Sequence, residues 1–242
     1  VEDLCDAVII GDADEVFGQV IKDIENNTLK KRYEKPLKKL SHPLPRYDLV
    51  VNKRIGDFLP VQAGRGCTMK CNFCSIFAVS KGKYIKRDIE EVIRDIKYVK
   101  SLGFKKFLLI DDNIVSEPAY MKKLLLEIKK LNMKWMSQCA VYIADDDELL
   151  DLAAESGCVT LSFGLESLNK ESMKVINKEW ANPDDYLRII KKVTDKGIDI
   201  ASEMIVGIDT DTRESLLDTV NFIDKSMIMA PKFYILTPVP GT

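Results

Sequence analysis

The sequence has no surplus of either charge and no long apolar run. Its 242 residues hold 36 Lys and Arg against 38 Asp and Glu, a net charge of −2, which argues against a protein that binds nucleic acid through a basic face. Apolar stretches such as Phe107–Ile110 are far shorter than the roughly 20 residues of a membrane span. The six cysteines are unevenly spaced and do not resemble a secreted disulfide framework, so we expect a cytoplasmic protein.

Low-complexity tracts are also lacking. Hydrophobic residues make up 46% of the chain and charged residues 31%, which is ordinary globular usage, and this length allows a sizeable core.

The chain begins at Val1 within an apparent strand and stops at Thr242 just after another strand-like run. We therefore expect a fragment of a longer protein.

The N-terminal end is split by charge. Residues 1–29 carry eight acids and one lysine, and we interpret them as the last strand and helix of an α/β domain. The strand is Ala7–Ile10, and the apolar positions of the helix are Val16, Val20, Ile21 and Ile24. Residues 30–54 carry nine basic residues, two acids and three prolines, which indicates a basic linker; a phosphate or acidic-partner site is the alternative.

Residues 55–242 alternate strand and helix patterns. The predicted strands are Phe58–Ala63, Lys106–Asp111, Trp135–Ile143, Val159–Gly164, Ile198–Val206 and Lys232–Thr237. Such alternation favours an all-parallel sheet, either doubly wound or a partial barrel, and no G-x-G-x-x-G motif follows the first strand to favour dinucleotide binding. Asp145 with Glu148, and Asp211 with Glu214, predict two helix starts.

The most specific motif lies in residues 64–74, where Cys67, Cys71 and Cys74 have the spacing C-x3-C-x2-C directly after the first strand. Three thiolates from one loop can hold three irons of a cubane cluster and leave the fourth iron open. Structural zinc is a weaker alternative because it takes four ligands and the only histidine, His42, is 25 residues upstream. A set of free thiols, or a fourth ligand from Cys5, Cys139 or Cys158, remains open.

The spacing, with an aromatic residue before the last cysteine, resembles the signature of the radical S-adenosylmethionine superfamily. Further segments resemble its branch with an N-terminal cobalamin-binding domain, which includes hopanoid-lipid methylases. These segments are residues 107–113, 135–138, 156–158, 163–167 and 237–241. The resemblance implies an α/β fold, a partial (β/α)6 TIM-like barrel over 55–242 preceded by the remnant of a Rossmann-like cobalamin-binding domain. It also implies a [4Fe-4S] cluster on the three cysteines, which reductively cleaves S-adenosylmethionine to a 5′-deoxyadenosyl radical.

The same resemblance implies which residues hold S-adenosylmethionine. They are Phe73, Asp111, Asp112, Asn113, Gln138, Ser162, Glu166, Glu203 and the backbone at Thr237. The superfamily often has Gly-Gly-Glu where this chain has Asp-Asp-Asn at 111–113, and a helix-capping turn is the alternative there. Glu203 lies within a strand, where a lone buried carboxylate is costly, so it is expected to be functional or to form an ion pair. Arg65 is expected to pair with a carboxylate, to face the anionic cluster or to lie in solvent.

We therefore expect an enzyme that methylates an unactivated carbon of a small-molecule, lipid or natural-product substrate, using cobalamin. The motif Asp-x-His-x-x-Gly, which would place a histidine on cobalt, is absent from these residues. The expected electron donor is a flavodoxin or ferredoxin, no nucleic-acid partner is expected, and a lipid substrate would bring the protein to the membrane surface. The alternatives are radical cyclisation, ring contraction or oxidation, and a non-enzymatic iron–sulfur protein. A tRNA methylthiotransferase is less favoured, because no second three-cysteine set is present.

Overall fold

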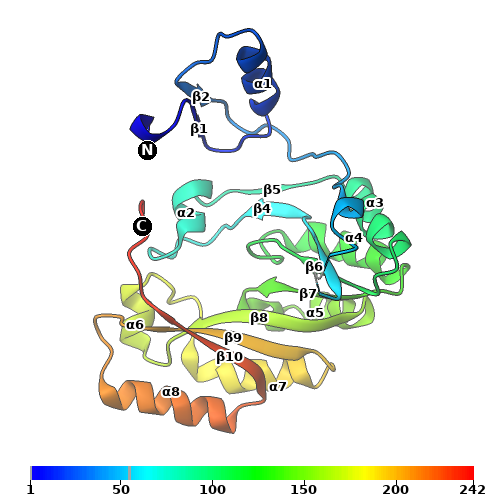
Figure 1. Cartoon of the computed structure of the whole chain (residues 1–242). Coiled ribbons are helices and arrows are strands. Elements are labelled where there is room, and N and C mark those ends of the chain that lie inside the picture. The colour runs from blue at the N-terminus through cyan, green and yellow to red at the C-terminus, as the bar shows by residue number, and fades with distance from the viewer. Residues whose placement is uncertain (1, 54–55) are drawn as a thin grey trace.

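The computed structural model describes residues 2–53 and 56–242, and its main feature is a six-stranded parallel sheet (Figure 1). Along the sheet the strands run β10-β9-β8-β7-β6-β3, so neighbours in space are also successive in sequence. This order builds a (β/α) barrel, since a doubly wound sheet reverses its order part of the way along. Strands β3 and β10 are the two edges, which confirms the predicted partial barrel. The strands are β3 (Phe58–Val61), β6 (Lys106–Leu109), β7 (Lys134–Cys139), β8 (Cys158–Glu166), β9 (Asp199–Val206) and β10 (Ile228–Ile235).

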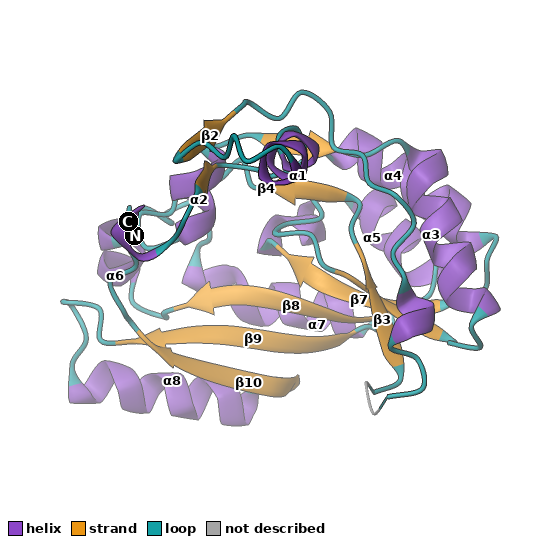
Figure 2. Ribbon diagram, turned by 45° about the horizontal axis from the view of Figure 1, so that its top comes forward, coloured by secondary structure: helices purple, strands orange, loops and turns teal. Residues whose placement is uncertain are grey.

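Helices cover the outer face of this sheet (Figure 2). On the first of them Val92, Ile96 and Val99 form an apolar stripe that is fully buried, and Gly103 follows the end of the helix with a φ of 91°. The helices are α3 (Ile89–Ser101), α4 (Pro118–Lys129), α5 (Asp147–Glu155), α6 (Lys170–Val175), α7 (Tyr186–Thr194) and α8 (Arg213–Lys225). None of the helices within 2–53 and 56–242 has the length and apolarity that a bilayer crossing requires.

The strands divide their side chains between two faces, as the period of two dictates. Phe107, Trp135 and Phe163 point to the helices and are fully buried. Their neighbours Leu108, Met136 and Ser162 point to the concave inner face and line an open hollow. The outer face therefore carries the core, and the inner face is free to carry chemistry.

Several element boundaries differ from the sequence prediction. The third barrel strand ends at Cys139 instead of Ile143, and Val141–Asp145 forms a 3-10 helix. The residues from Val141 to Ala144 are mostly apolar and do not alternate with polar ones, as a half-buried strand would. The N-cap of α5 is Asp146, whose carboxylate accepts from the Leu149 N–H, so the prediction of Asp145 is wrong by one residue. The cap of α8 is Thr212, paired reciprocally with Ser215, and Asp211 instead accepts from Gly207 and Ile208.

The N-terminal residues form a separate small βαβ unit above the barrel (Figure 1). Strand β1 (Val8–Ile10) pairs in parallel with β2 (Arg32–Glu34), with α1 (Phe17–Glu25) between them. The predicted linker thus contains a strand of the preceding unit, besides a 3-10 turn at Tyr47–Leu49. Of the four predicted apolar helix positions, Val16 and Val20 are buried, whereas Ile21 and Ile24 are exposed because two strands cover only one side of α1.

An excursion between β3 and α3 brings the cysteine motif to the mouth of the barrel. Strand β4 (Gly64–Gly66) pairs antiparallel with β5 (Tyr84–Lys86), and α2 (Ser75–Ser80) lies between them. The three cysteines occupy the turn from β4 into α2. Two further 3-10 turns are Glu2–Leu4 and Pro183–Asp185, the latter capped by Asn182.

Candidate functional site

The three motif cysteines line one pocket at the C-terminal ends of the barrel strands. Cys71 is buried, whereas Cys67 and Cys74 are half-buried. The pocket has a volume of about 190 Å³, and Phe73 from the same loop also lines it. Burial raises the pKa of Cys71 to about 11, and the neighbouring thiols Cys74 and Cys67 add to that effect while Lys178 opposes it. Three thiols brought together in this way are a ligand set for positively charged iron.

A glycine and a carboxylate fix the start of the cysteine loop. Gly66 has a φ of 94°, and a Cβ there would lie 2.1 Å from the carbonyl oxygen of Lys83, so only glycine fits. The Gly66 N–H donates to Oδ2 of Asp112 over 2.7 Å. Asp112 also lines the cysteine pocket, so it connects the end of the second barrel strand to the loop.

The neighbouring Asp111 has a different environment. Its carboxylate accepts from the Ala63 N–H at 2.7 Å and from the Tyr84 hydroxyl at 2.8 Å, and the residue is 1% exposed. Burial raises its pKa to about 6, against the lowering effect of these donors. Asp111 does not line the cysteine pocket within the described residues. Its two donors come from the residue before β4 and from β5, so Asp111 braces the β4–β5 pair.

Asn113 completes the predicted trio and touches the motif directly. Its Nδ2 lies 3.7 Å from Sγ of Cys67 and donates to the Tyr142 hydroxyl over 3.1 Å. Its Oδ1 accepts from the Ala140 N–H at 3.0 Å, which fixes the amide orientation. An N–H donated to a cluster thiolate is one of the ways in which a protein adjusts a reduction potential.

A buried ion pair forms the opposite wall. Glu166 ends β8 with a φ of 61°, and its Oε1 accepts from Nζ of Lys178 at 2.6 Å. Both side chains are 8% exposed, and burial raises the pKa of Glu166 while the Lys178 ammonium opposes the rise. A Cβ at Gly164 would lie 2.3 Å from the Glu166 Oε1, so this glycine makes room for the pair. Lys178 also lies 5.2 Å from the ring of Trp180.

Three residues predicted separately come together on the inner face. Oε1 of Glu203 accepts from Gln138 Nε2 at 3.3 Å and from Ser162 Oγ at 3.2 Å. All three line the cysteine pocket, and they come from β9, β7 and β8 respectively. Lys232 of β10 is 3.7 Å from the same oxygen. The half-buried Glu203 on β9 is therefore an acceptor for side chains from three other strands, β7, β8 and β10.

Other predicted residues lie elsewhere. Thr237 is exposed, its hydroxyl donates to the Ile235 carbonyl, and it is not among the described residues that line the cysteine pocket. Cys139, one of the three candidates for a fourth ligand, is buried and lines the pocket. Lys178 and Trp180 were not predicted, because nothing in the pattern of residues 170–180 distinguishes a buried lysine from a solvated one.

The three motif thiols line the same pocket. In residues 2–53 and 56–242, no three His, Cys, Asp or Glu side chains converge on a position for one metal ion. A cubane does not require such convergence, because each thiolate binds a different iron. The donor chemistry of three thiols that line one pocket fits a cluster held by Cys67, Cys71 and Cys74.

Arg65 connects the cysteine loop to the N-terminal unit. Its guanidinium pairs with Asp12 and, at 2.9 Å, with Asp14, and it donates to Gln62 at 3.2 Å. Gln62 in turn contacts Nε2 of His42 at 3.1 Å. The first of the three predictions for Arg65, a pairing with carboxylate, is the one observed.

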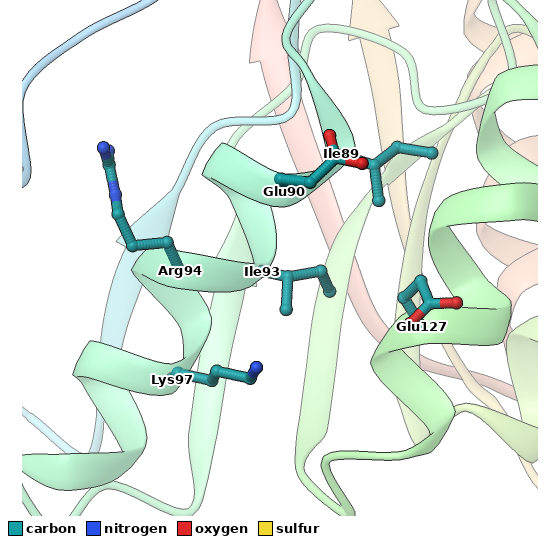
Figure 3. Close-up of a pocket in the computed structure, with 6 residues that line it drawn as sticks. All are labelled: Ile89, Glu90, Ile93, Arg94, Lys97 and Glu127. Atoms are coloured by element: carbon teal, nitrogen blue, oxygen red, sulfur yellow. The ribbon is translucent and has the colours of Figure 1, made fainter.

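A second concavity, of about 490 Å³, lies on the outside of the barrel between α3 and α4 (Figure 3). Ile89 and Ile93 form its apolar part, and charges of both signs surround them. It contains no thiol among its lining residues, so the chemistry belongs to the smaller pocket at the strand ends.

Comparison with known proteins agrees with this geometry. The Radical SAM superfamily model matches residues 61–223. The chain is 30% identical to bacteriochlorophyllide d C-12(1)-methyltransferase of Chlorobaculum tepidum, over 98% of this chain and 54% of that protein, and it thus spans about half the length of such curated relatives. Among solved structures, the cobalamin-dependent radical enzyme OxsB covers 91% of this chain with a TM-score of 0.74 and 14% identity, and the match spans 36% of OxsB. The methyltransferase TsrM of Kitasatospora setae covers 74% with a TM-score of 0.67 and 19% identity, the match spanning 34% of TsrM. This chain belongs to the radical S-adenosylmethionine superfamily.

Proposed function

We propose that this chain is the radical-generating barrel of a cobalamin-dependent enzyme that methylates an unactivated carbon. The observation that carries the proposal is the pocket at the strand ends, where three thiols face Glu166, Gln138 and Glu203. The methyltransferases among its relatives support the reaction class. The expected substrate is a small molecule, a lipid or a natural product, a range that the bacteriochlorophyllide methyltransferases among its relatives support.

In this proposal Cys67, Cys71 and Cys74 hold the cluster. When bound, the cluster supplies the single electron that cleaves S-adenosylmethionine into methionine and a 5′-deoxyadenosyl radical. Asn113 donates its amide N–H toward the Cys67 sulfur and so tunes the thiolate. Asp112 keeps the loop backbone in place through Gly66.

The remaining pocket residues bind and orient S-adenosylmethionine. Phe73 offers an aromatic face to the adenine, with the backbone at Thr237 on its other side. Glu166, fixed by Lys178, and the acceptor Glu203 offer carboxylates to hydroxyl and ammonium donors. Gln138 and Ser162 orient Glu203, because their hydrogen bonds occupy one of its oxygens and leave the other available.

Cobalamin is proposed to bind between the N-terminal unit and the barrel mouth. The similarity to OxsB, whose structure has aqua-cobalamin bound, supports the cofactor, and the attachment of the unit to the cysteine loop through Arg65 supports the position. His42 contacts Gln62, and no histidine of this chain belongs to a cobalt-binding motif, so the cofactor would bind without a histidine on cobalt from these residues.

An acidic one-electron donor such as a flavodoxin or ferredoxin is proposed to dock over the cysteine loop. Residues 67–83 contain no Asp or Glu, and the exposed lysines Lys70, Lys81 and Lys83 form no ion pair within the described part of the chain. Lysines on this outer side complement an acidic partner and place it near the cluster. A cytoplasmic location, peripheral to the membrane if the substrate is a lipid, fits such a donor.

The test is the fate of S-adenosylmethionine and the content of corrinoid. Chain reconstituted without oxygen and reduced with dithionite is expected to form equal amounts of 5′-deoxyadenosine and methionine, Cys71→Ala to form none, and the control Cys158→Ala to retain the reaction. The full-length protein, purified from cells supplied with cobalamin, is expected to show a corrinoid absorption spectrum. Cleavage without corrinoid would favour radical cyclisation or oxidation, and a cluster without any cleavage would contradict the proposal.

A further inference from the structure

The open hollow on the inner face of the sheet, which Leu108, Met136 and Ser162 line, adjoins the cysteine pocket. It has a volume of about 370 Å³, and Gln138 and Ser162 line both spaces. Six of its other lining residues are Leu108, Ile110, Met136, Thr160, Ala201 and Lys232. A volume in this range suits a small organic ligand. The pair Gln138 and Ser162 thus forms a shared boundary, across which a ligand in the hollow would face the contents of the cysteine pocket.

The hollow has an apolar wall and a single cation. The apolar wall consists of Leu108 on β6, Ile110 directly after β6, and Met136 on β7. Ile110 is 45% exposed, an unfavourable position for a large apolar side chain unless something covers it. The one lining carboxylate, Asp111, already accepts from Ala63 and Tyr84 and is thereby directed away from any ligand.

Lys232 is the charged group that this hollow can offer. It stands opposite Glu203 in the β9–β10 register, and its Nζ is 3.7 Å from Oε1 of Glu203. That distance is an ion pair without a short hydrogen bond, and the same oxygen already accepts from Gln138 and Ser162. The side chain of Lys232 is 46% exposed. Its ammonium therefore keeps N–H donors for an anion in the hollow.

We infer that the hollow is the substrate site and that it takes a largely apolar molecule with one anionic group, which Lys232 binds. This inference rests on the proposed function, since it assigns the substrate of the same reaction. The apolar body covers Leu108, Ile110 and Met136, and the anion selects the orientation. Lys232 is then the specificity-determining residue, because an ammonium at the edge of an apolar site discriminates against neutral analogues.

The test uses two fluorescent probes of similar shape on the reconstituted chain. The probe 8-anilinonaphthalene-1-sulfonate is apolar with one anion, and N-phenyl-1-naphthylamine lacks the anion. Lys232→Met is expected to weaken binding of the sulfonate about tenfold or more, as the loss of a charge-assisted hydrogen bond implies, and to leave the neutral probe unchanged. Lys232→Arg is expected to restore the sulfonate.

Variants that fill the hollow control for binding elsewhere. Ala201→Trp, and independently Thr160→Phe, are expected to weaken both probes, with folding checked by thermal unfolding. Unchanged sulfonate binding in Lys232→Met, or unchanged binding of both probes in the two filled variants, would overturn the inference. Cleavage of S-adenosylmethionine by the unsubstituted chain in dithionite is measured in the same preparations, so failure of the substrate assignment is distinguishable from failure of the radical chemistry.

Discussion

The two faces of the parallel sheet use the same strands for opposite purposes. On the outer face Phe107, Trp135 and Phe163 are fully buried against helices. On the inner face Gln138, Ser162 and Glu203 form a hydrogen-bonded group beside the cysteine pocket. Because side chains alternate along a strand, neighbouring residues of the same strand contribute to the packed core and to the site respectively. The difference indicates that the outer face holds the strands rigid enough to position the inner one.

The outer face is expected to give the largest loss of stability. Phe107→Ala removes a fully buried ring and should cost about 3–5 kcal/mol of the free energy of unfolding. Leu108→Ala, one residue along on the inner face, is the matched control, and it should cost much less because Leu108 lines a hollow. Urea unfolding of the two variants checks this. Equal losses would show that the faces do not differ in the way described.

The buried ion pair should follow closely. Lys178→Met leaves the Glu166 carboxylate without its partner in a site where both side chains are 8% exposed, which typically costs about 3–5 kcal/mol. The double variant Lys178→Met with Glu166→Gln removes the unpaired charge and should recover most of that loss. A double variant no more stable than the single one, measured by thermal and urea unfolding, would mean that the pair contributes through packing and not through charge.

Asp111 is expected to make stability depend on pH. Burial raises its folded pKa to about 6 from 3.8, so the folded state holds a proton that the unfolded state has released between about pH 4 and 6. The free energy of unfolding should therefore fall as the pH rises through that window, by about 3 kcal/mol. Asp111→Asn should lack this fall. Urea titrations of both proteins at several pH values measure the two free energies of unfolding. The value of the unsubstituted chain minus that of Asp111→Asn should fall between about pH 4 and 6, and a value that stays constant or rises would rule out the assignment.

Arg65 should give the smallest effect. Arg65→Met removes the pairing with Asp12 and Asp14, at a cost of about 1 kcal/mol, and should leave barrel stability nearly unchanged. Hydrogen exchange should become faster for the amides of β1 and β2 but not for those of β8. The control Arg46→Met breaks only the local pair with Asp48 and should change neither region. Faster exchange throughout the barrel in Arg65→Met would mean that the N-terminal unit supports the whole fold.

Periodicity was sufficient to predict a parallel α/β sheet and cysteine spacing the ligand loop, whereas the choice of a barrel over a doubly wound sheet came from the resemblance to the superfamily. Strand alternation with helices requires only local pattern, and the glycine-rich turn into Cys67 is a local feature as well. Helix caps failed by one residue at Asp145 and Asp211, because adjacent polar residues compete for the same cap and backbone geometry decides between them.

Contacts between distant segments were beyond the sequence. Nothing local indicates that Lys178 is buried against Glu166, or that Asp111 braces β4 while its neighbour Asp112 holds the loop. Thr237 was assigned by resemblance, and its exposed side chain hydrogen-bonds within its own segment. Such roles depend on which strand ends lie side by side, and that is a property of the assembled partial barrel.

The central claim is that three thiols hold a cluster with one iron open to S-adenosylmethionine. The most direct measurement is electron paramagnetic resonance of the anaerobically reconstituted, dithionite-reduced chain, recorded with and without S-adenosylmethionine. A reduced cubane signal that shifts when S-adenosylmethionine is added, and that is lost in Cys67→Ala, Cys71→Ala and Cys74→Ala but kept in Cys158→Ala, is the expected result. A signal that ignores S-adenosylmethionine, or bound zinc without iron, would contradict the claim.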